Sequence, residues 1–198
     1  MLKRILSTKK KGLFILPFVS VVVEKTNYFQ AILKPLDLKI QGKYANRGKS
    51  FEEEDVDIFV CTIEKANSLI NRWIEEKKVD QIGIIVIDEI HMMSDRDRGY
   101  ILELLVTKLI YHSSISFQLV GLSATLPNIE NFQKWLKGAL YVTNFRPVPL
   151  VQYIKCGKYI YDKNEQVVRE LLSNQYSHSA RDPEMVKKFS IFGIFFQI

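Results

Sequence analysis

The 198-residue sequence indicates an α/β fold, in which helices cover both faces of a parallel β-sheet. Short apolar runs alternate along the chain with longer segments of helical periodicity, as in successive right-handed βαβ units. The run Ile84–Ile87 is apolar at every position. Such a run is typical of a strand that is buried on both sides within a parallel sheet.

Six short runs are the expected strands. They span Leu13–Leu16, Leu38–Gln41, Ile58–Cys61, Ile84–Ile87, Leu119–Leu122 and Leu140–Thr143. Apolar residues at helical spacing predict two of the helices between them, one carrying Ala66, Leu69, Ile70, Trp73 and Ile74 and the other Leu102, Leu105, Val106 and Leu109. A further helix is expected between Asn128, a suitable N-cap, and Gly138, a suitable C-terminal stop.

The composition argues against several classes of protein. Lysine and arginine number 28 against 22 aspartates and glutamates, so the net charge of +6 favours polyanionic partners without requiring them. Cys61 and Cys156 lie far apart without metal-binding spacing, which argues against a disulfide scaffold or zinc site and indicates an intracellular protein. No run reaches the roughly 18 apolar residues of a membrane helix, and the N-terminal apolar stretch is too short for a signal peptide.

The segment Asp88-Glu89-Ile90-His91 is the first candidate site. It directly follows the run Ile84–Ile87, and in open α/β sheets the chemistry collects at the carboxyl ends of the strands. An aspartate there can hold Mg²⁺ through water, and a neighbouring glutamate can polarise a water for attack on a phosphoryl group. The alternative is that the two carboxylates only mark the turn that leaves the strand.

Three other strand ends carry candidate residues, each with a purely structural alternative. Ser123 and Thr125 follow Leu119–Leu122, where their hydroxyl groups either bond a neighbouring carboxylate or simply form a turn. Thr62 precedes a helix and is suited either to bind a phosphate or to cap that helix. The segment Pro17–Val19 leads from a strand into the next helix, which on its own is an ordinary β-to-α turn.

Six segments occur in an order that resembles a known enzyme family. They are Pro17–Lys25, Cys61–Asn67, Asp88–His91, Asp97–Tyr100, Ser123–Thr125 and Asn144–Leu150. In order and spacing they resemble the Ia, Ib, II, III and later motifs of superfamily-two helicases, most closely those of the DNA polymerase theta type. The resemblance covers about residues 1–165 and implies the RecA-like fold of a first helicase motor lobe.

The resemblance also implies a role for each matched residue. Asp88 would hold Mg²⁺ through water on the phosphates of ATP, Glu89 would activate the hydrolytic water, and His91, Ser123 and Thr125 would couple the nucleotide state to the nucleic-acid surface. The residues expected along single-stranded DNA are Pro17, Phe18, Val19, Thr62, Glu64, Lys65, Arg98 and Gly99. Such contacts go mostly to the sugar-phosphate backbone, so binding would not depend on sequence.

The family's phosphate-binding loop has no counterpart in this sequence. The nearest segment, Gly42–Ser50, separates its glycines by five residues instead of four and is followed by the acidic run Phe51–Asp55. We therefore expect a lobe that is incomplete at its N-terminus and inactive in ATP hydrolysis by itself.

In the family the strand before that loop lies beside the strand ending at Ser123. We expect an unpaired sheet edge there, unless the apolar segment Phe189–Phe196 fills it.

Three functions are compatible with these residues. The first is a fragment of a nuclear ATP-dependent DNA helicase, which by the resemblance uses ATP and Mg²⁺, acts in DNA repair and works with a second lobe. The second is a catalytically inactive fragment that binds nucleic acid or a protein partner, and the third is a lobe of a related RNA helicase. The expected domains are the first lobe at residues 1–150, the start of the connection to the second lobe at 151–165, and a divergent tail at 166–198.

Overall fold

The computed structural model describes residues 1–44, 53–112, 117–123, 129–143, 153–156, 158–162, 164–171 and 194–197. The chain divides into two compact units, one comprising Met1–Thr143 with Gly193–Ile198 and the other Asn144–Phe192. The first contains a seven-stranded sheet with its helices, and the second contains a three-stranded antiparallel sheet. The domain limits expected at residues 150 and 165 stay predictions.

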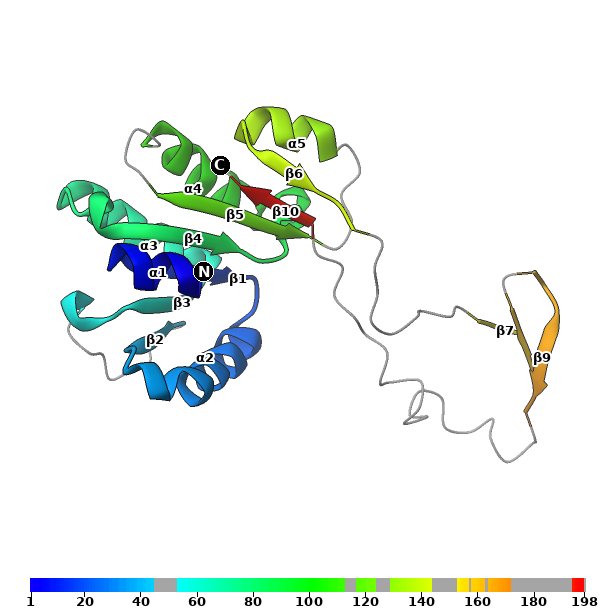
Figure 1. Ribbon diagram of the computed structural model, residues 1–198. Coiled ribbons are helices and arrows are strands. Elements are labelled where there is room, and N and C mark those ends of the chain that lie inside the picture. The colour runs from blue at the N-terminus through cyan, green and yellow to red at the C-terminus, as the bar shows by residue number, and fades with distance from the viewer. Residues whose placement is uncertain are drawn as a thin grey trace. The chain divides into compact units, whose positions relative to one another are not determined.

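Helices and strands alternate along the first unit (Figure 1). In chain order its elements are α1 (Leu2–Thr8), β1 (Lys11–Leu16), α2 (Val19–Leu33), η1 (Lys34–Leu36), β2 (Ile40–Lys43), η2 (Glu53–Asp55), β3 (Ile58–Thr62), α3 (Ile63–Glu75), η3 (Val79–Gln81), β4 (Ile82–Ile87), η4 (Ile90–Ser94), α4 (Gly99–Tyr111), β5 (Gln118–Ser123), α5 (Ile129–Leu136), β6 (Ala139–Tyr141) and β10 (Ile194–Gln197). The second unit holds β7 (Ile154–Cys156), β8 (Tyr159–Tyr161) and β9 (Val167–Glu170).

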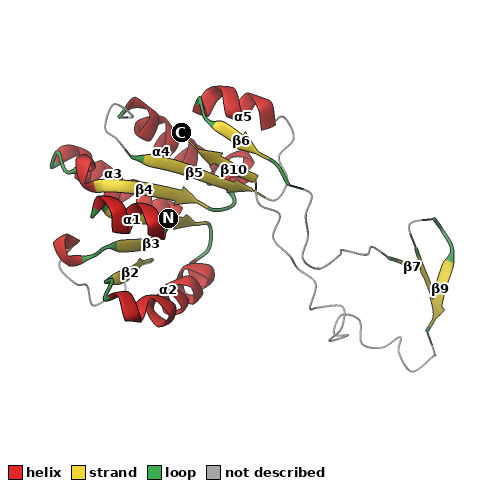
Figure 2. Cartoon of the chain, in the orientation of Figure 1, coloured by secondary structure: helices red, strands yellow, loops and turns green. Residues whose placement is uncertain are grey.

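The sheet of the first unit has the order β2-β3-β1-β4-β5-β10-β6. Strand β1 pairs in parallel with β3 on one side and β4 on the other, while β2 joins β3 and β5 joins β4, also in parallel. Helices lie on both faces of this sheet (Figure 2). The predicted α/β architecture is therefore confirmed, and all six expected strands form, with ends displaced by one or two residues.

Alternation of side chains along the central strands builds two hydrophobic cores, one on each face of the sheet. Leu13 and Ile15 of β1 point into the core under α3 and α4, whereas Leu16 points into the core under α1 and α2. Strand β4 alternates in the same way and is buried at all six positions. Helices α3 and α4 complete the first core through the apolar stripes that the sequence predicts.

Strand β10 corrects the expectation of an unpaired edge beside β5 and agrees with the alternative, in which the C-terminal apolar segment fills that edge. Residues 194–197 pair antiparallel with residues 120–123 of β5 and with β6 on the other side. Leu119 of β5 is buried. A β-ladder needs only extended backbone with free N–H and C=O groups, so a segment distant in sequence can satisfy an open edge.

Helix α1 and the three-stranded sheet of the second unit have no counterpart among the sequence-based expectations. Helix α1 packs on the sheet through Ile5, whose side chain lies so close to Gly12 that a Cβ there would stand 2.5 Å from Ile5 Cδ1. In the second unit, β8 pairs with both β7 and β9. Within the part of the chain that the structure describes, no helix has the length and apolarity needed to cross a bilayer.

We predict that deleting residues 194–198 destabilises the chain and promotes self-association. Four residue pairs with β5 and three with β6 would be lost. If this costs about 2–3 kcal/mol, the melting temperature should fall by roughly 5–10 °C. Thermal unfolding and size-exclusion chromatography of both chains would test this. An unchanged melting temperature and a monomeric shortened chain would show that β10 contributes little to the fold.

Candidate functional site

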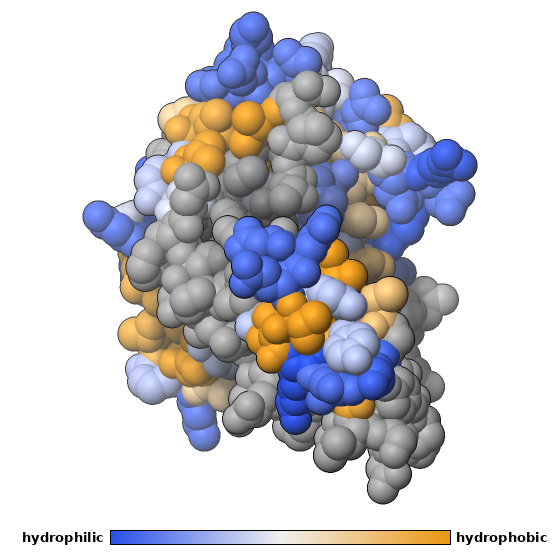
Figure 3. Space-filling view, turned by 90° about the vertical axis from the view of Figure 1, so that its right-hand side faces the viewer, coloured by the Kyte–Doolittle hydropathy of each residue, from blue (hydrophilic) through white to orange (hydrophobic). Residues whose placement is uncertain are grey.

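Parallel pairing brings the predicted site residues to one edge of the sheet. Strand β1 lies between β3 and β4, so the residues that follow these three strands leave the sheet side by side. Pro17 is buried after β1, whereas Phe18 and Val19 are about half exposed at the start of α2. On the face of the molecule drawn in Figure 3, hydrophobic patches lie among hydrophilic ones.

Asp88 lies at the end of β4 in a partly buried position. Its backbone N–H donates to the carbonyl oxygen of Ile15 at 2.9 Å, and its Oδ1 accepts the backbone N–H of Glu89 at 3.0 Å. Burial raises the pKa of the Asp88 carboxyl, although the Glu89 hydrogen bond, the charge of Lys25 and the electrostatic effect of the His91 imidazole oppose this. A cation bound nearby would therefore stabilise the ionised form of the Asp88 carboxyl.

Glu89 turns the chain out of the strand in a left-handed backbone conformation, with φ 53° and ψ 46°. Such a conformation costs a non-glycine residue about 1 kcal/mol or more and is concentrated at functional sites. Glu89 Oε2 lies 3.2 Å from Nδ1 of His91, and the same nitrogen lies 3.1 Å from Oγ of Ser123. The structure thus brings together three of the five predicted catalytic residues in one contact chain.

The remaining two catalytic predictions differ in their outcome. Asp88 adjoins this chain through the backbone of Glu89. Thr125 lies outside the described residues, so its predicted role stays a prediction.

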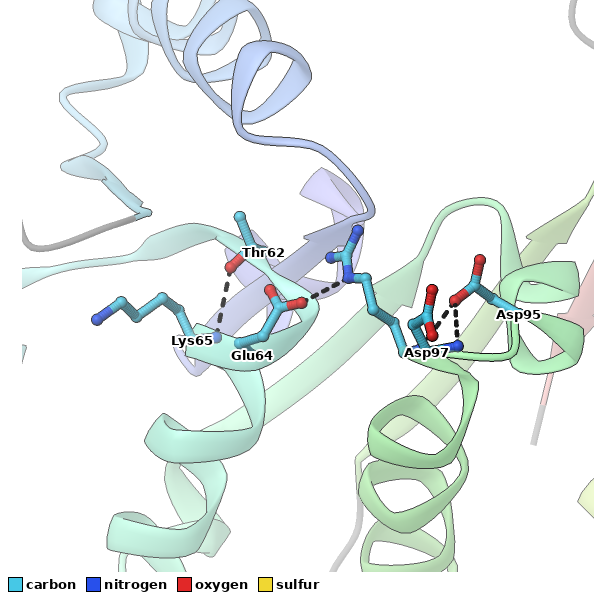
Figure 4. A network of polar contacts seen from close by, with 6 residues as sticks. Thr62, Glu64, Lys65, Asp95 and Asp97 are labelled. Atoms are coloured by element: carbon cyan, nitrogen blue, oxygen red, sulfur yellow. Dashed lines mark hydrogen bonds and ion pairs between the residues drawn. The ribbon is translucent and has the colours of Figure 1, made fainter.

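Five of the residues predicted along the nucleic acid, Thr62, Glu64, Lys65, Arg98 and Gly99, lie at the starts of α3 and α4. Thr62 is the N-cap of α3, and its Oγ1 accepts the backbone N–H of Lys65 at 3.4 Å (Figure 4). Arg98 Nε donates to Oε1 of Glu64 at 2.7 Å, an ion pair that joins segments 34 residues apart. The buried Thr62 hydroxyl thus acts as a helix cap, and phosphate binding by it stays a prediction.

Burial and charge act in opposite directions on Glu64. Partial burial by itself would raise the pKa of the carboxyl, but the hydrogen bonds from Arg98, from its own backbone and from Thr62, together with the Arg98 charge, hold it below the usual value. Glu64 is therefore ionised at neutral pH, and its charge is matched by a guanidinium.

Asp95 is a structural residue of this site that the sequence reasoning missed. Its Oδ1 accepts the backbone N–H groups of Asp97 at 3.0 Å and Arg98 at 2.8 Å, which fixes the turn before α4 (Figure 4). An aspartate two and three residues before these N–H groups is a recognisable sequence signal for such a turn. Position 99 requires glycine because the backbone of Met93 lies close to it, and a Cβ at this position would lie 2.2 Å from the carbonyl oxygen of Met93.

Lys25 of α2 was also missed as a site residue. Its charge acts on Asp88, and its Nζ lies 3.1 Å from Glu24 Oε1. Only the pairing of β1 with β4 brings α2 near the end of β4, so no local sequence pattern indicates this neighbour. Among the described residues, no group of three or more His, Cys, Asp or Glu side chains is arranged to hold a metal ion.

Comparison with known proteins gives consistent matches over most of the chain. The family profile of the DEAD/DEAH box helicases matches residues 1–132. DNA polymerase theta of Mus musculus is 48% identical over an alignment of 183 residues, and the match covers 85% of this chain and 7% of that protein. The Helicase POLQ-like protein of Homo sapiens is 34% identical over 194 residues, covering 93% of this chain and 18% of that protein.

An archaeal relative and a solved structure extend the comparison. The ATP-dependent DNA helicase Hel308 of Methanococcus vannielii is 37% identical over 158 residues, covering 80% of this chain and 20% of that protein. The chain thus spans a fifth or less of each of these three relatives. The crystal structure of the DUF1998 helicase MrfA superposes with a TM-score of 0.54 at 15% identity, over 69% of this chain and 23% of that chain, which supports the fold alone.

We predict that Gly99→Ala destabilises the protein although alanine is the better helix former. The new Cβ would collide with backbone atoms of Met93, at 2.2 Å from its oxygen and 2.8 Å from its carbon, and backbone cannot move aside cheaply. The expected cost is about 1–3 kcal/mol in urea unfolding. Thr107→Ala, at an exposed position of the same helix, is the control and should change stability little. Equal stability of the two variants would contradict the close approach.

Glu64→Gln should change how stability depends on pH. The carboxyl has a lowered pKa in the folded chain, so the Arg98 pair stabilises the fold at neutral pH. As the pH falls through the ordinary value of 4.5 and below, the unfolded chain takes up the proton first and this contribution is lost. Melting curves between pH 3 and 7 should show a smaller acid destabilisation for Glu64→Gln than for Glu75→Gln, an exposed glutamate of the same helix. If the melting temperatures of the two variants fall equally with decreasing pH, the Glu64–Arg98 pair does not stabilise the fold.

Proposed function

Because this chain belongs to the DEAD/DEAH box helicases, as its motifs indicate, we propose that it acts as the first motor lobe of an ATP-dependent DNA helicase. The observation that carries the proposal is the contact chain Glu89–His91–Ser123, which links the acidic end of β4 to the end of the neighbouring strand β5. The expected role in DNA repair, the nuclear location and the second lobe as a partner belong to the same proposal.

The residues at the end of β4 fit a magnesium nucleotide. The Asp88 carboxylate is a hard oxygen donor, it is partly buried, and burial makes a cation its natural partner. Asp88 would hold Mg²⁺ through water. Bound ATP would supply the phosphoryl group that is attacked, with its charge neutralised by the ion.

Glu89 would act as the general base toward the attacking water. Its left-handed backbone carries it out of the strand, and its side chain is about one-third exposed, so that water can reach it. His91 holds Oε2 of Glu89 at 3.2 Å and so limits the orientations of the carboxylate. The same imidazole nitrogen contacts the buried Ser123, which is the last residue of β5. A movement of Glu89 would therefore change the position of His91 and its contact with β5.

The nucleic-acid side of the proposal rests on the starts of α2, α3 and α4. Phe18 and Val19 offer exposed apolar surface for bases, while Lys65 and Arg98 bring positive charge to the same edge. Arg98 is held by Glu64, so it is oriented before a strand binds. The relatives named as DNA helicases favour DNA over RNA as the substrate.

A second candidate is a lobe that binds nucleic acid without hydrolysing ATP. In the helicase family a parallel strand beside β5 leads into the phosphate-binding loop, but here β10 occupies that place in the antiparallel direction. Strand β10 therefore begins beside Ser123 and runs toward the edge of the sheet opposite Asp88, whereas the family's strand ends at the edge where Asp88 lies. This observation favours binding without turnover for the chain with β10 in place.

We predict that the 198-residue chain binds labelled single-stranded DNA weakly, without sequence preference, and with an affinity that falls steeply with salt. Fluorescence anisotropy over a salt series measures this. Lys65→Ala and Arg98→Ala should each weaken binding to all sequences roughly three- to tenfold. Lys134→Ala, an exposed lysine of α5, is the control and should bind as the unchanged chain does.

Phosphate release in the presence of the same oligonucleotide separates the two candidates. DNA-stimulated turnover that Glu89→Gln abolishes would establish the motor lobe with Glu89 as its base. Binding without turnover would establish the second candidate for this chain, and equal binding of single-stranded RNA would favour an RNA helicase. A chain that binds neither nucleic acid would overturn the proposal.

A further inference from the structure

A polar cluster joins α3 and α4 beyond the Glu64–Arg98 pair. The Lys108 ammonium, on the last turns of α4, donates to Oδ1 of Asn67 at 2.9 Å and to Oδ1 of Asn71 at 2.7 Å, both on α3. The two helices lie side by side (Figure 1) and bury their apolar stripes in the same core. All three polar residues are partly exposed, so the cluster borders solvent along the seam between the helices.

The chemistry of lysine fixes the orientation of both amides. An ammonium group has donors and no acceptor, so Asn67 and Asn71 must turn their oxygens toward Lys108. Their NH₂ groups then face away from the ammonium. Across the residues that the structure describes, neither amide nitrogen has an acceptor, and Lys108 has no carboxylate within ion-pair distance. The cluster thus carries a positive charge and offers several N–H donors without an anion.

The position of the cluster points to the anion that it would bind. Asn67 follows Glu64 by three residues on α3, about one helical turn from the edge where Arg98 lies. Asn71 continues the same line by another turn. A backbone that contacts the starts of α3 and α4 would reach the cluster by following the seam between the two helices.

We propose that Asn67, Asn71 and Lys108 form a binding site for one phosphate of a nucleic-acid backbone, continuing the strand path along the α3–α4 seam. The proposal rests on the proposed binding of single-stranded DNA and adds a contact to it. A phosphate oxygen accepts the amide N–H groups, and the Lys108 charge, balanced only by neutral amide oxygens, supplies the attraction.

The variant Asn71→Asp separates this role from a purely structural one. An aspartate has nearly the same shape and keeps an oxygen for Lys108, so the link between the helices is preserved as an ion pair. It loses both N–H donors and brings a negative charge toward the phosphate. Asn67→Asp makes the same change one turn away and serves if the first variant folds poorly.

The measurement is the affinity of each full-length variant for labelled oligothymidylate over a salt series. We expect Asn71→Asp to bind roughly three- to tenfold more weakly and its log–log salt slope to shrink by about 0.7, the value for one lost phosphate contact to a single strand. Its melting temperature should be unchanged or higher. Asn27→Asp, exposed on α2 over the opposite face of the sheet, makes the same charge change and should bind like the unchanged chain.

Lys108→Met completes the set, because it removes both the charge and the link between the helices. It should lower the DNA affinity, the salt slope and the melting temperature. If both aspartate variants keep the original affinity and slope while Lys108→Met lowers only the melting temperature, the cluster merely braces the helices and the inference is wrong. An equal loss in Asn27→Asp would also overturn it. A parent chain that does not bind the oligonucleotide would instead refute the proposed function itself.

Discussion

Parallel pairing around β1 is the constraint on which the site depends. Because β1 lies between β3 and β4, the residues after three separate strands leave the sheet at one edge. The pairing of β4 with β5 extends that edge to Ser123. These strands are held in register by apolar side chains that enter both cores, and β4 is buried at every position. The relative positions of the site residues, which follow four different strands, therefore depend on the register of the sheet.

The site itself carries local costs that this sheet must support. The pKa of Asp88 is raised because the carboxyl is partly buried, and Glu89 adopts a left-handed backbone conformation that is unfavourable for residues other than glycine. Both features destabilise the isolated fold, and both make chemical sense if a cation and a phosphoryl group approach the end of β4. The ladder from β1 through β4 supplies the rigidity that keeps these two carboxylates in place.

Helices α3 and α4 show how polar contacts add direction to apolar packing. Their apolar stripes bury them in one core, but apolar contacts tolerate sliding and rotation. The Glu64–Arg98 pair at their starts and the Lys108 contacts farther along connect the same two helices at separate points. Since hydrogen bonds have narrow distance and angle requirements, they set the relative position of the helices more closely.

The sequence by itself determined six strands of the seven-stranded sheet, the α3 and α4 stripes and the family, because periodicity and ordered motifs are local properties. It also identified Asp88, Glu89 and His91, which lie within four residues of one another. Only the tertiary structure decided that His91 contacts Ser123, that Arg98 pairs with Glu64, and that Lys108 reaches two asparagines 41 and 37 residues away. It also decided that β10 fills the edge beside β5, because backbone pairing across the sheet depends on which open edge an extended segment meets and leaves no local signal in the chain.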